Sequence, residues 1–115
     1  MAVHEDIREN MRRGLTEMLL LCLLRESDKY GYQLLSELNE RTSGVFKVTL
    51  ASLYGPLYRF LSKGYVTETR VAAGQKRFRN YYHLTEDGEA YYQIMVEEYK
   101  RTYLQINKLI GWKGD

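Results

Sequence analysis

The chain lacks the features of a secreted or membrane-spanning protein. Its 115 residues include one cysteine, so no disulfide bond can form within the chain. Its longest apolar run, Met18–Leu24, has seven residues, whereas a helix that spans a bilayer needs about 20. The N-terminus carries no signal-peptide pattern. We therefore expect a cytoplasmic protein that does not enter a membrane.

The sequence also lacks the signs of a multidomain protein or an enzyme. It contains one proline and no Ser/Gly-rich linker, low-complexity tract or internal repeat, which favours a single domain. Cys22, His4 and His83 do not have the spacing of metal ligands. There is no Gly-rich phosphate loop, and no nucleophile has a neighbouring base. We expect no catalytic activity, no cofactor and no metal site.

Charge of one sign is concentrated in the middle of the chain. Residues 41–83 carry eight Lys or Arg against one acid, Glu68, which leaves a net charge of +7. The flanking residues 1–40 and 84–110 are both net acidic. This distribution points to a polyanionic partner for the middle segment.

An amphipathic helix is predicted within Val48–Val66. Thr49 can cap its first amides, and Gly64 suits a left-handed residue at its end. One face is apolar and formed by Leu50, Leu53, Leu57, Phe60 and Leu61. Because Pro56 lacks an amide hydrogen and its ring crowds the preceding turn, we expect a bend or a frayed turn there.

The other faces of this helix carry hydroxyls, phenols and cations suited to the major groove of DNA. Thr49, Ser52 and Tyr54 are candidates for contacts with base edges, and Arg59 and Lys63 for contacts with phosphates. Two simpler roles stay open, because Tyr54 could be a core aromatic and Thr49 only a cap.

Two more helices are predicted before it. Leu15–Leu24 is apolar on all sides, so one face can meet the core and the other a second subunit. Arg25–Lys29 is a polar break, and Tyr30–Thr42 has Leu34, Leu35 and Leu38 as a buried stripe. Tyr32 could touch a phosphate or simply pack. The order predicts a helix-turn-helix.

A β-hairpin follows the third helix. Tyr65–Val71 alternates and is rich in β-branched residues, Ala72–Lys76 supplies a turn, and Phe78–Leu84 is the return strand. Tyr81 and Tyr82 should face opposite ways, so that one belongs to the core. The cations Lys76, Arg77 and Arg79 could neutralise phosphates or enter the minor groove, or they could form an ordinary solvated turn.

A long helix is predicted from Thr85, its cap, to about Ile110, with Gly111 ending it. Apolar residues recur along it at alternating spacings of four and three, which is a coiled-coil seam. A seam of this length requires a partner. Candidate residues for a dimer interface and a site for flat apolar ligands are Met11, Leu15, Met18, Tyr92, Val96, Tyr99 and Tyr103. The alternative is a filled interface with no cavity.

These elements predict a mainly α fold with a small β-hairpin. We expect an N-terminal arm over residues 1–14, a winged helix-turn-helix over 15–84 and a C-terminal dimerisation helix over 85–111.

The sequence also resembles the PadR family of bacterial transcriptional regulators, in its short subfamily with a single C-terminal helix. The matching stretches are Arg13–Leu24, Tyr30–Leu35, Ser52–Val66 and Arg79–Gly88. The resemblance implies a homodimer on a palindromic operator, usually acting as a repressor. It also implies that a phenolic or drug-like compound could bind at the dimer interface. Two positions depart from the family pattern: Gly55 stands where a proline is usual, with Pro56 after it, and Asn80 replaces a lysine of the wing.

Three functions follow from this reading. A dimeric regulator that binds double-stranded DNA through the third helix and the wing accounts for most of the pattern. A winged helix that binds an acidic protein, and a small-molecule sensor without direct DNA reading, are the alternatives.

Overall fold

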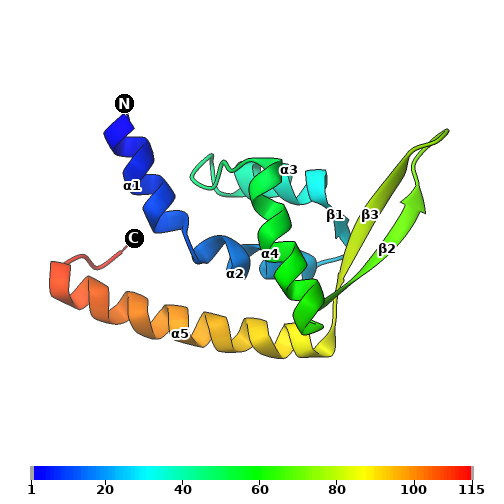
Figure 1. Ribbon diagram of the computed structural model, residues 1–115. Coiled ribbons are helices and arrows are strands. Elements are labelled where there is room, and N and C mark those ends of the chain that lie inside the picture. Colours follow the sequence, from blue (N-terminus) through cyan, green and yellow to red (C-terminus); the bar gives the residue numbers. More distant parts are fainter. Residues whose placement is uncertain (1, 115) are drawn as a thin grey trace.

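The computed structural model describes residues 2–114, in which five helices pack together and a small sheet projects from one side of them (Figure 1). In chain order the elements are α1 (Ala2–Arg12), α2 (Leu15–Leu24), β1 (Lys29–Tyr30), α3 (Gly31–Arg41), α4 (Leu50–Lys63), β2 (Val66–Ala72), β3 (Phe78–Leu84) and α5 (Glu86–Ile110). This confirms the predicted mainly α fold with a small hairpin. No helix in the described part of the chain is long and apolar enough to cross a membrane.

The apolar helix α2 lies at the centre and packs against α1, α3, α5 and β3. Its residues Leu20, Leu21, Leu23 and Leu24 are buried, whereas its other residues are half-buried. The rest of the core consists of Leu34, Leu38, Leu53, Leu57, Phe60, Val66 and Tyr82. The prediction that α2 meets the core with one face is thus confirmed.

Helices α3 and α4 form the predicted helix-turn-helix, with Leu34 and Leu38 of α3 buried and Leu35 partly buried. The Thr49 side chain accepts a hydrogen bond from the Ser52 amide at 3.2 Å, and Gly64 ends α4 in the left-handed region.

Of the bend or frayed turn expected at Pro56, the frayed turn is wrong, because α4 is helical from Leu50 to Lys63 without interruption. The missing amide would have donated to the carbonyl of Ser52. Ser52 lies on the exposed side of the helix, where water can satisfy that carbonyl. The proline therefore removes one helical hydrogen bond without breaking the helix.

The hairpin is confirmed, but it belongs to a three-stranded antiparallel sheet in the order β1-β3-β2. Lys29 pairs with Tyr82, and Tyr30 with Tyr81, so the end of the expected polar break is in fact a short strand. Tyr82 is the tyrosine that enters the core, and Tyr81 remains half-buried.

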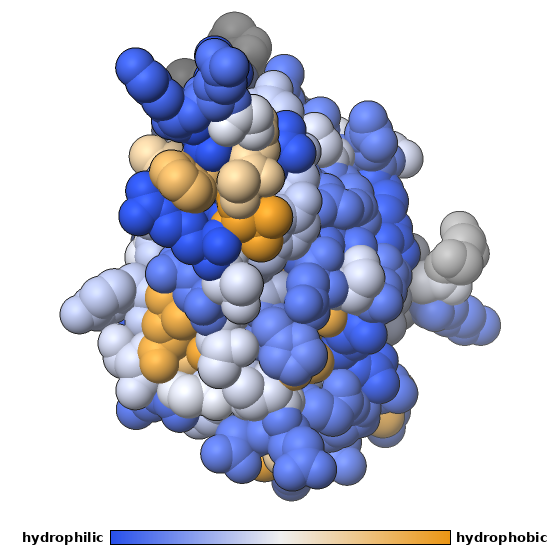
Figure 2. Space-filling view, turned by 90° about the vertical axis from the view of Figure 1, so that its right-hand side faces the viewer, coloured by the Kyte–Doolittle hydropathy of each residue, from blue (hydrophilic) through white to orange (hydrophobic). Residues whose placement is uncertain are grey.

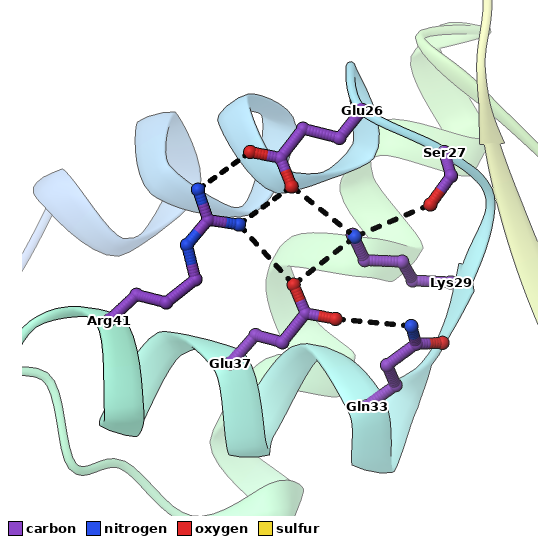
Figure 3. A network of polar contacts seen from close by, with 6 residues as sticks. All are labelled: Glu26, Ser27, Lys29, Gln33, Glu37 and Arg41. Carbon is purple, nitrogen blue, oxygen red and sulfur yellow. Dashed lines mark hydrogen bonds and ion pairs between the residues drawn. The ribbon is translucent and has the colours of Figure 1, made fainter.

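A buried ammonium group holds the turn between α2 and α3 (Figure 3). Lys29 is only 4% exposed, and its Nζ lies 3.2 Å from Glu37 and 3.5 Å from Glu26. The Arg41 guanidinium donates hydrogen bonds to both carboxylate oxygens of Glu26, at 2.6 and 2.7 Å. Because both partners are charged and the pair is bidentate, it is stronger than a single exposed ion pair. This bidentate hydrogen bonding by Arg41 lowers the pKa of Glu26 to about 2.

The start of α5 is fixed tightly against the end of α4. Thr85 Oγ1 donates to the Gly64 carbonyl at 2.7 Å and accepts from the Gly88 amide at 3.0 Å. A β-carbon on Gly88 would lie only 2.0 Å from the Tyr65 carbonyl oxygen. The absence of a side chain at position 88 therefore permits this close approach.

Helix α5 runs along one edge of the molecule and continues past α2 (Figure 1). Its 25 residues correspond to about 37 Å, and Tyr99, Tyr103, Ile106 and Ile110 are all exposed. The radius of gyration is 15.8 Å, against about 13 Å for a compact domain of this length. A large apolar surface thus has no partner within the described chain.

The contact at Gly88 predicts that Gly88→Ala destabilises the fold by about 2 kcal/mol or more, because the added methyl overlaps a backbone oxygen. Gly55→Ala is the matched control: its β-carbon would lie 3.7 Å from the nearest atom, Arg59 Nη1. This control should be neutral or stabilise α4 by up to about 1 kcal/mol. Urea unfolding at one protein concentration measures both, and equal effects would contradict the close approach.

The Arg41–Glu26 pair predicts a pH-dependent coupling. The folded-state pKa of Glu26, about 2, lies below its ordinary 4.5, so the stabilisation is complete above pH 4.5 and is lost as the pH falls toward 2. A double-mutant cycle with Glu26→Gln and Arg41→Ala should show a coupling energy at pH 6 that shrinks steadily below pH 4.5. A coupling that stays constant down to pH 2.5 would contradict it.

Candidate nucleic-acid interface

Helix α4 turns one side to the core and the opposite side to solvent. Leu53 and Phe60 are buried. Since each residue of an α-helix is turned by about 100° from the one before it, the residues on the opposite side can be identified, and they are exposed. The centre of the exposed side is formed by Ala51, Gly55 and Tyr58, with Tyr58 the most exposed at 71%. None of the three was a predicted contact residue, although the helical wheel of the sequence contains the signal. Small residues beside a tyrosine leave room for another surface to approach the helix.

The predicted residues Thr49 and Ser52 flank this exposed side at the start of α4. Both are exposed, and each is already engaged in the helix cap: Ser52 Oγ donates to the Thr49 carbonyl at 2.6 Å. Each hydroxyl keeps an acceptor lone pair for an outside donor. Lys63 is exposed at the far end of the helix.

A groove of about 380 Å³ separates α4 from the hairpin, which we call the wing groove. Three predicted residues from three elements line it: Tyr32 of α3, Tyr54 of α4 and Arg79 of β3. Tyr32 and Tyr54 are 62% and 52% exposed. The complete lining is Tyr30, Gly31, Tyr32, Leu50, Tyr54, Phe78, Arg79, Asn80 and Tyr82. Residues far apart in the sequence are thus assembled on one concave surface.

Two tyrosines, Tyr30 and Tyr82, shape this groove. The Arg79 guanidinium lies 4.4 Å from the centre of the Tyr30 ring, which holds the cation at the edge of the groove. Burial, followed by the neighbouring Glu68 carboxylate, raises the pKa of Tyr82 to about 12. The phenol beneath the groove therefore stays neutral and adds no negative charge.

Not all the cations of residues 41–83 are available to a partner. Arg41 is held by Glu26, and Arg59 Nη2 lies 2.6 Å from Glu17 of α2. Acids from the first forty residues thus neutralise two of the eight, which the charge count alone could not show. The cations that form no ion pair within residues 2–114 are Lys47, Lys63, Arg70, Lys76, Arg77 and Arg79. Four of these six lie on the hairpin.

The hairpin turn presents two of the predicted cations to solvent. Gly74 and Lys76 adopt positive φ angles of 123° and 59°, and the Ala73 amide donates to the Arg77 carbonyl at 3.0 Å. Lys76 and Arg77 are both exposed. A narrow tip with two free cations is therefore placed beyond the wing groove.

A second hollow of about 520 Å³ lies on the other flank of α4, against α1 and α2. Its charged lining mixes basic and acidic side chains, namely Glu9, Arg12, Arg13, Glu17, Lys47 and Arg59. Arg12 Nη1 donates to the Val45 carbonyl at 2.9 Å. Sequence reasoning did not join these residues, because they come from three separate elements.

The residues predicted for a dimer or effector surface lie on α1, α2 and α5. Met11 is 69% exposed, whereas Leu15, Met18, Tyr92 and Val96 are half-buried. Tyr99 and Tyr103 stack with ring centres 5.7 Å apart, and Trp112 meets Tyr103 edge-on at 6.1 Å. Cys22 lies beside Tyr92 and raises the pKa of that phenol.

Histidine and acidic side chains do not form a metal centre. No group of three or more His, Cys, Asp or Glu within residues 2–114 could hold a metal ion. His83 pairs with Asp28 at 2.7 Å, on the side of the sheet base away from the wing groove.

Comparison with known proteins gives a consistent result. The model of the transcriptional regulator PadR-like family matches residues 20–94. An uncharacterised protein from Lysinibacillus sphaericus is 35% identical over 96 residues, which cover 81% of this chain and 85% of that protein. A transcriptional regulator from Clostridium thermocellum has a TM-score of 0.79 at 29% identity, covering 86% of this chain and 96% of its own.

Bacillus subtilis PadR, solved in complex with operator DNA, is also similar. It has a TM-score of 0.66 and 22% identity over 71% of this chain and 47% of that chain. At this identity the likeness shows the shared fold.

Proposed function

The chain belongs to the PadR-like family of transcriptional regulators, and from this we propose that it is a cytoplasmic repressor that binds a palindromic operator as a homodimer. The observation that carries the proposal is the convergence of Tyr32, Tyr54 and Arg79 on the wing groove, beside the exposed side of α4. As in the solved PadR–operator complex, the partner would be double-stranded DNA.

Helix α4 would enter the major groove with Ala51, Gly55 and Tyr58 facing the bases. An alanine methyl suits a thymine methyl, and a glycine lets the backbone come close. Thr49, Ser52 and Tyr54 would donate or accept hydrogen bonds at base edges or phosphates beside them. Shape and polarity thus favour reading by the N-terminal half of α4, as in other recognition helices.

Cations at the end of α4 and on the wing would position the protein on the phosphate backbone. Lys63 at the end of α4 and Lys76, Arg77 and Arg79 on the wing have no acidic partner among the described residues, so they can bind phosphates without first breaking an ion pair. Arg59 would have to leave Glu17, which makes it the weakest of the predicted phosphate contacts.

The C-terminal helix α5 would form the dimer together with α1 and α2. Ile106 and Ile110, both exposed, continue a seam that no other described residue of the chain covers. A second copy provides the same seam by two-fold symmetry. The two reading helices would then contact half-sites about 34 Å apart. In this division, residues 1–14 are the arm, 15–84 bind DNA and 85–111 dimerise.

The same interface could take a flat aromatic effector that releases the operator. The stacked pair Tyr99–Tyr103 and the edge of Trp112 supply exposed aromatic surface there, and aromatic side chains suit planar apolar ligands. A protein-interaction module is the alternative to DNA binding, since the same cations could bind an acidic partner.

The wing cations predict a change in the salt dependence of binding. Selection from genomic fragments yields an operator duplex, on which fluorescence anisotropy measures affinity from 50 to 300 mM salt. Lys76→Ala with Arg77→Ala should weaken binding to all sequences alike. Each lost phosphate contact reduces the slope of log affinity against log salt by about 0.9. With two cations removed from each of two subunits, the slope should fall by up to about 3.6.

Arg101→Ala with Lys108→Ala, which removes two cations from the outer side of α5, is the matched control and should leave the slope unchanged. A folded dimer that is not retained on duplex DNA at low salt would overturn the proposal and favour the protein-interaction role.

The seam predicts that Ile106→Glu yields a monomer, because it places a carboxylate at the centre of an apolar interface. Analytical ultracentrifugation should show the change in mass, and operator affinity should fall at least about 100-fold as the second half-site is lost. Gln105→Glu introduces the same carboxylate beside the seam and should remain dimeric. An Ile106→Glu protein that stays dimeric would contradict the seam.

A further inference from the structure

The wing carries one exposed aromatic side chain beside the cations that are proposed to bind phosphates. Phe78, at the start of β3, is 57% exposed, although phenylalanine is usually among the more buried residues. Figure 2 views the molecule from the wing side and shows hydrophobic atoms gathered at the hairpin in its upper part, among strongly hydrophilic ones. An exposed aromatic in this position is unexplained by the packing of the sheet.

Phe78 lies on the inner face of the hairpin, toward α4. In a strand, residues two apart share a face, and Tyr82, four positions on, enters the core. Phe78 also lines the wing groove together with Tyr32 and Tyr54. Val71, by contrast, adjoins Ala72, the partner of Phe78, so it lies on the opposite face of the hairpin, and it is 42% exposed.

The surroundings of this ring are basic. The Arg70 guanidinium lies 4.4 Å from the centre of the Phe78 ring, and Lys76, Arg77 and Arg79 follow within the same hairpin. Glu68, the one acid of this segment, sits at the base of the sheet opposite Tyr82. An apolar ring that has one guanidinium on its face and lies on a hairpin with three further cations is complementary to a polyanion that also has an apolar surface.

The hairpin tip is narrow. Ala72, which pairs with Phe78, is followed by Ala73 and Gly74, so the strand opposite Phe78 adds little bulk toward the tip. The minor groove of B-DNA is only about 6 Å wide, and its walls are the apolar faces of deoxyriboses. A slim tip with one flat ring fits such a space.

We propose that Phe78 is a minor-groove contact residue, which packs its ring against the deoxyribose wall flanking each half-site while Arg70 neutralises the adjoining phosphate. The proposal rests on the proposed function, because α4 in the major groove would place the hairpin across the phosphate ridge, over the next minor groove. Phenylalanine is among the apolar residues that proteins insert into minor grooves.

The test uses the full-length dimer and the selected operator duplex. Phe78→Ala should weaken binding about tenfold or more, because the dimer loses two buried rings. It should leave the slope of log affinity against log salt unchanged, since no charge is removed. Hydroxyl radicals attack deoxyribose hydrogens in the minor groove, so footprinting should show flanking protection that Phe78→Ala loses.

Two further variants separate this role from a structural one. Phe78→Leu keeps an apolar side chain and should retain most of the affinity and the footprint. Val71→Ala removes apolar atoms from the outer face of the same hairpin and should change neither.

The outcomes are distinguishable. If the wild type binds the operator but Phe78→Ala keeps both its affinity and the flanking protection, the inference is wrong and the proposed function stands. If Val71→Ala and Phe78→Ala weaken binding equally, in step with a lowered unfolding temperature, Phe78 only stabilises the hairpin and the inference is also wrong. If the wild type binds no duplex, the proposed function itself fails.

Discussion

The burial of α2 is the constraint on which the other elements depend. A chain of 115 residues is small enough to have a single hydrophobic core built around one helix. That helix is α2, which α1, α3, α5 and β3 all contact. Leu20 and Leu21 are completely buried, so moving any neighbouring element away would expose apolar surface. The exposed side of α4, the wing and the long α5 are therefore positioned by packing against a shared centre, and the proposed interface is built on a rigid base.

Electrostatics divides the basic residues of the chain between the fold and its surface. Lys29 is buried between two carboxylates, and Arg41 closes the network by holding Glu26. These cations fix the turn between α2 and α3, so they cannot serve a partner. Breaking such a network would leave a charge without its partner, which costs more than an exposed pair is worth. The hairpin, which has a single acid at its base, keeps its cations free.

Much of the fold could be predicted because its signals are local. Apolar spacing defines α2, α3 and α4, and a residue that can cap a helix start, such as Thr49 or Thr85, marks where α4 and α5 begin. The strand β1 could not be predicted, since two residues make no pattern and their pairing with Tyr81 and Tyr82 is a long-range contact. The unbroken helix at Pro56 could not be predicted either. The cost of the lost hydrogen bond depends on whether the freed Ser52 carbonyl is exposed to water, and tertiary packing decides that.

The candidate site was predictable in its parts but not in its assembly. Tyr32, Tyr54 and Arg79 were candidates from residue type and charge, and the wing groove that joins them follows only from tertiary packing. The ion pair that engages Arg59 was equally hidden, because its partner Glu17 lies 42 positions away. The roles of these residues at DNA remain predictions.

The same ion pair bears on how two half-sites could be held in register. Glu17 and Met18 are neighbours on α2: one pairs with Arg59 of α4, and the other belongs to the surface predicted for the dimer. A palindromic operator requires a fixed distance between two reading helices, and that distance is set by every contact along the path from one α4 to the other. Within one subunit α2 packs against α5, its buried leucines belong to the same core cluster as Leu53 and Leu57 of α4, and its Glu17 pairs with Arg59 of α4 at 2.6 Å. Because packed interiors resist compression, this shared core, rather than the exposed ion pair, would hold α4 at a fixed distance from the α2–α5 surface.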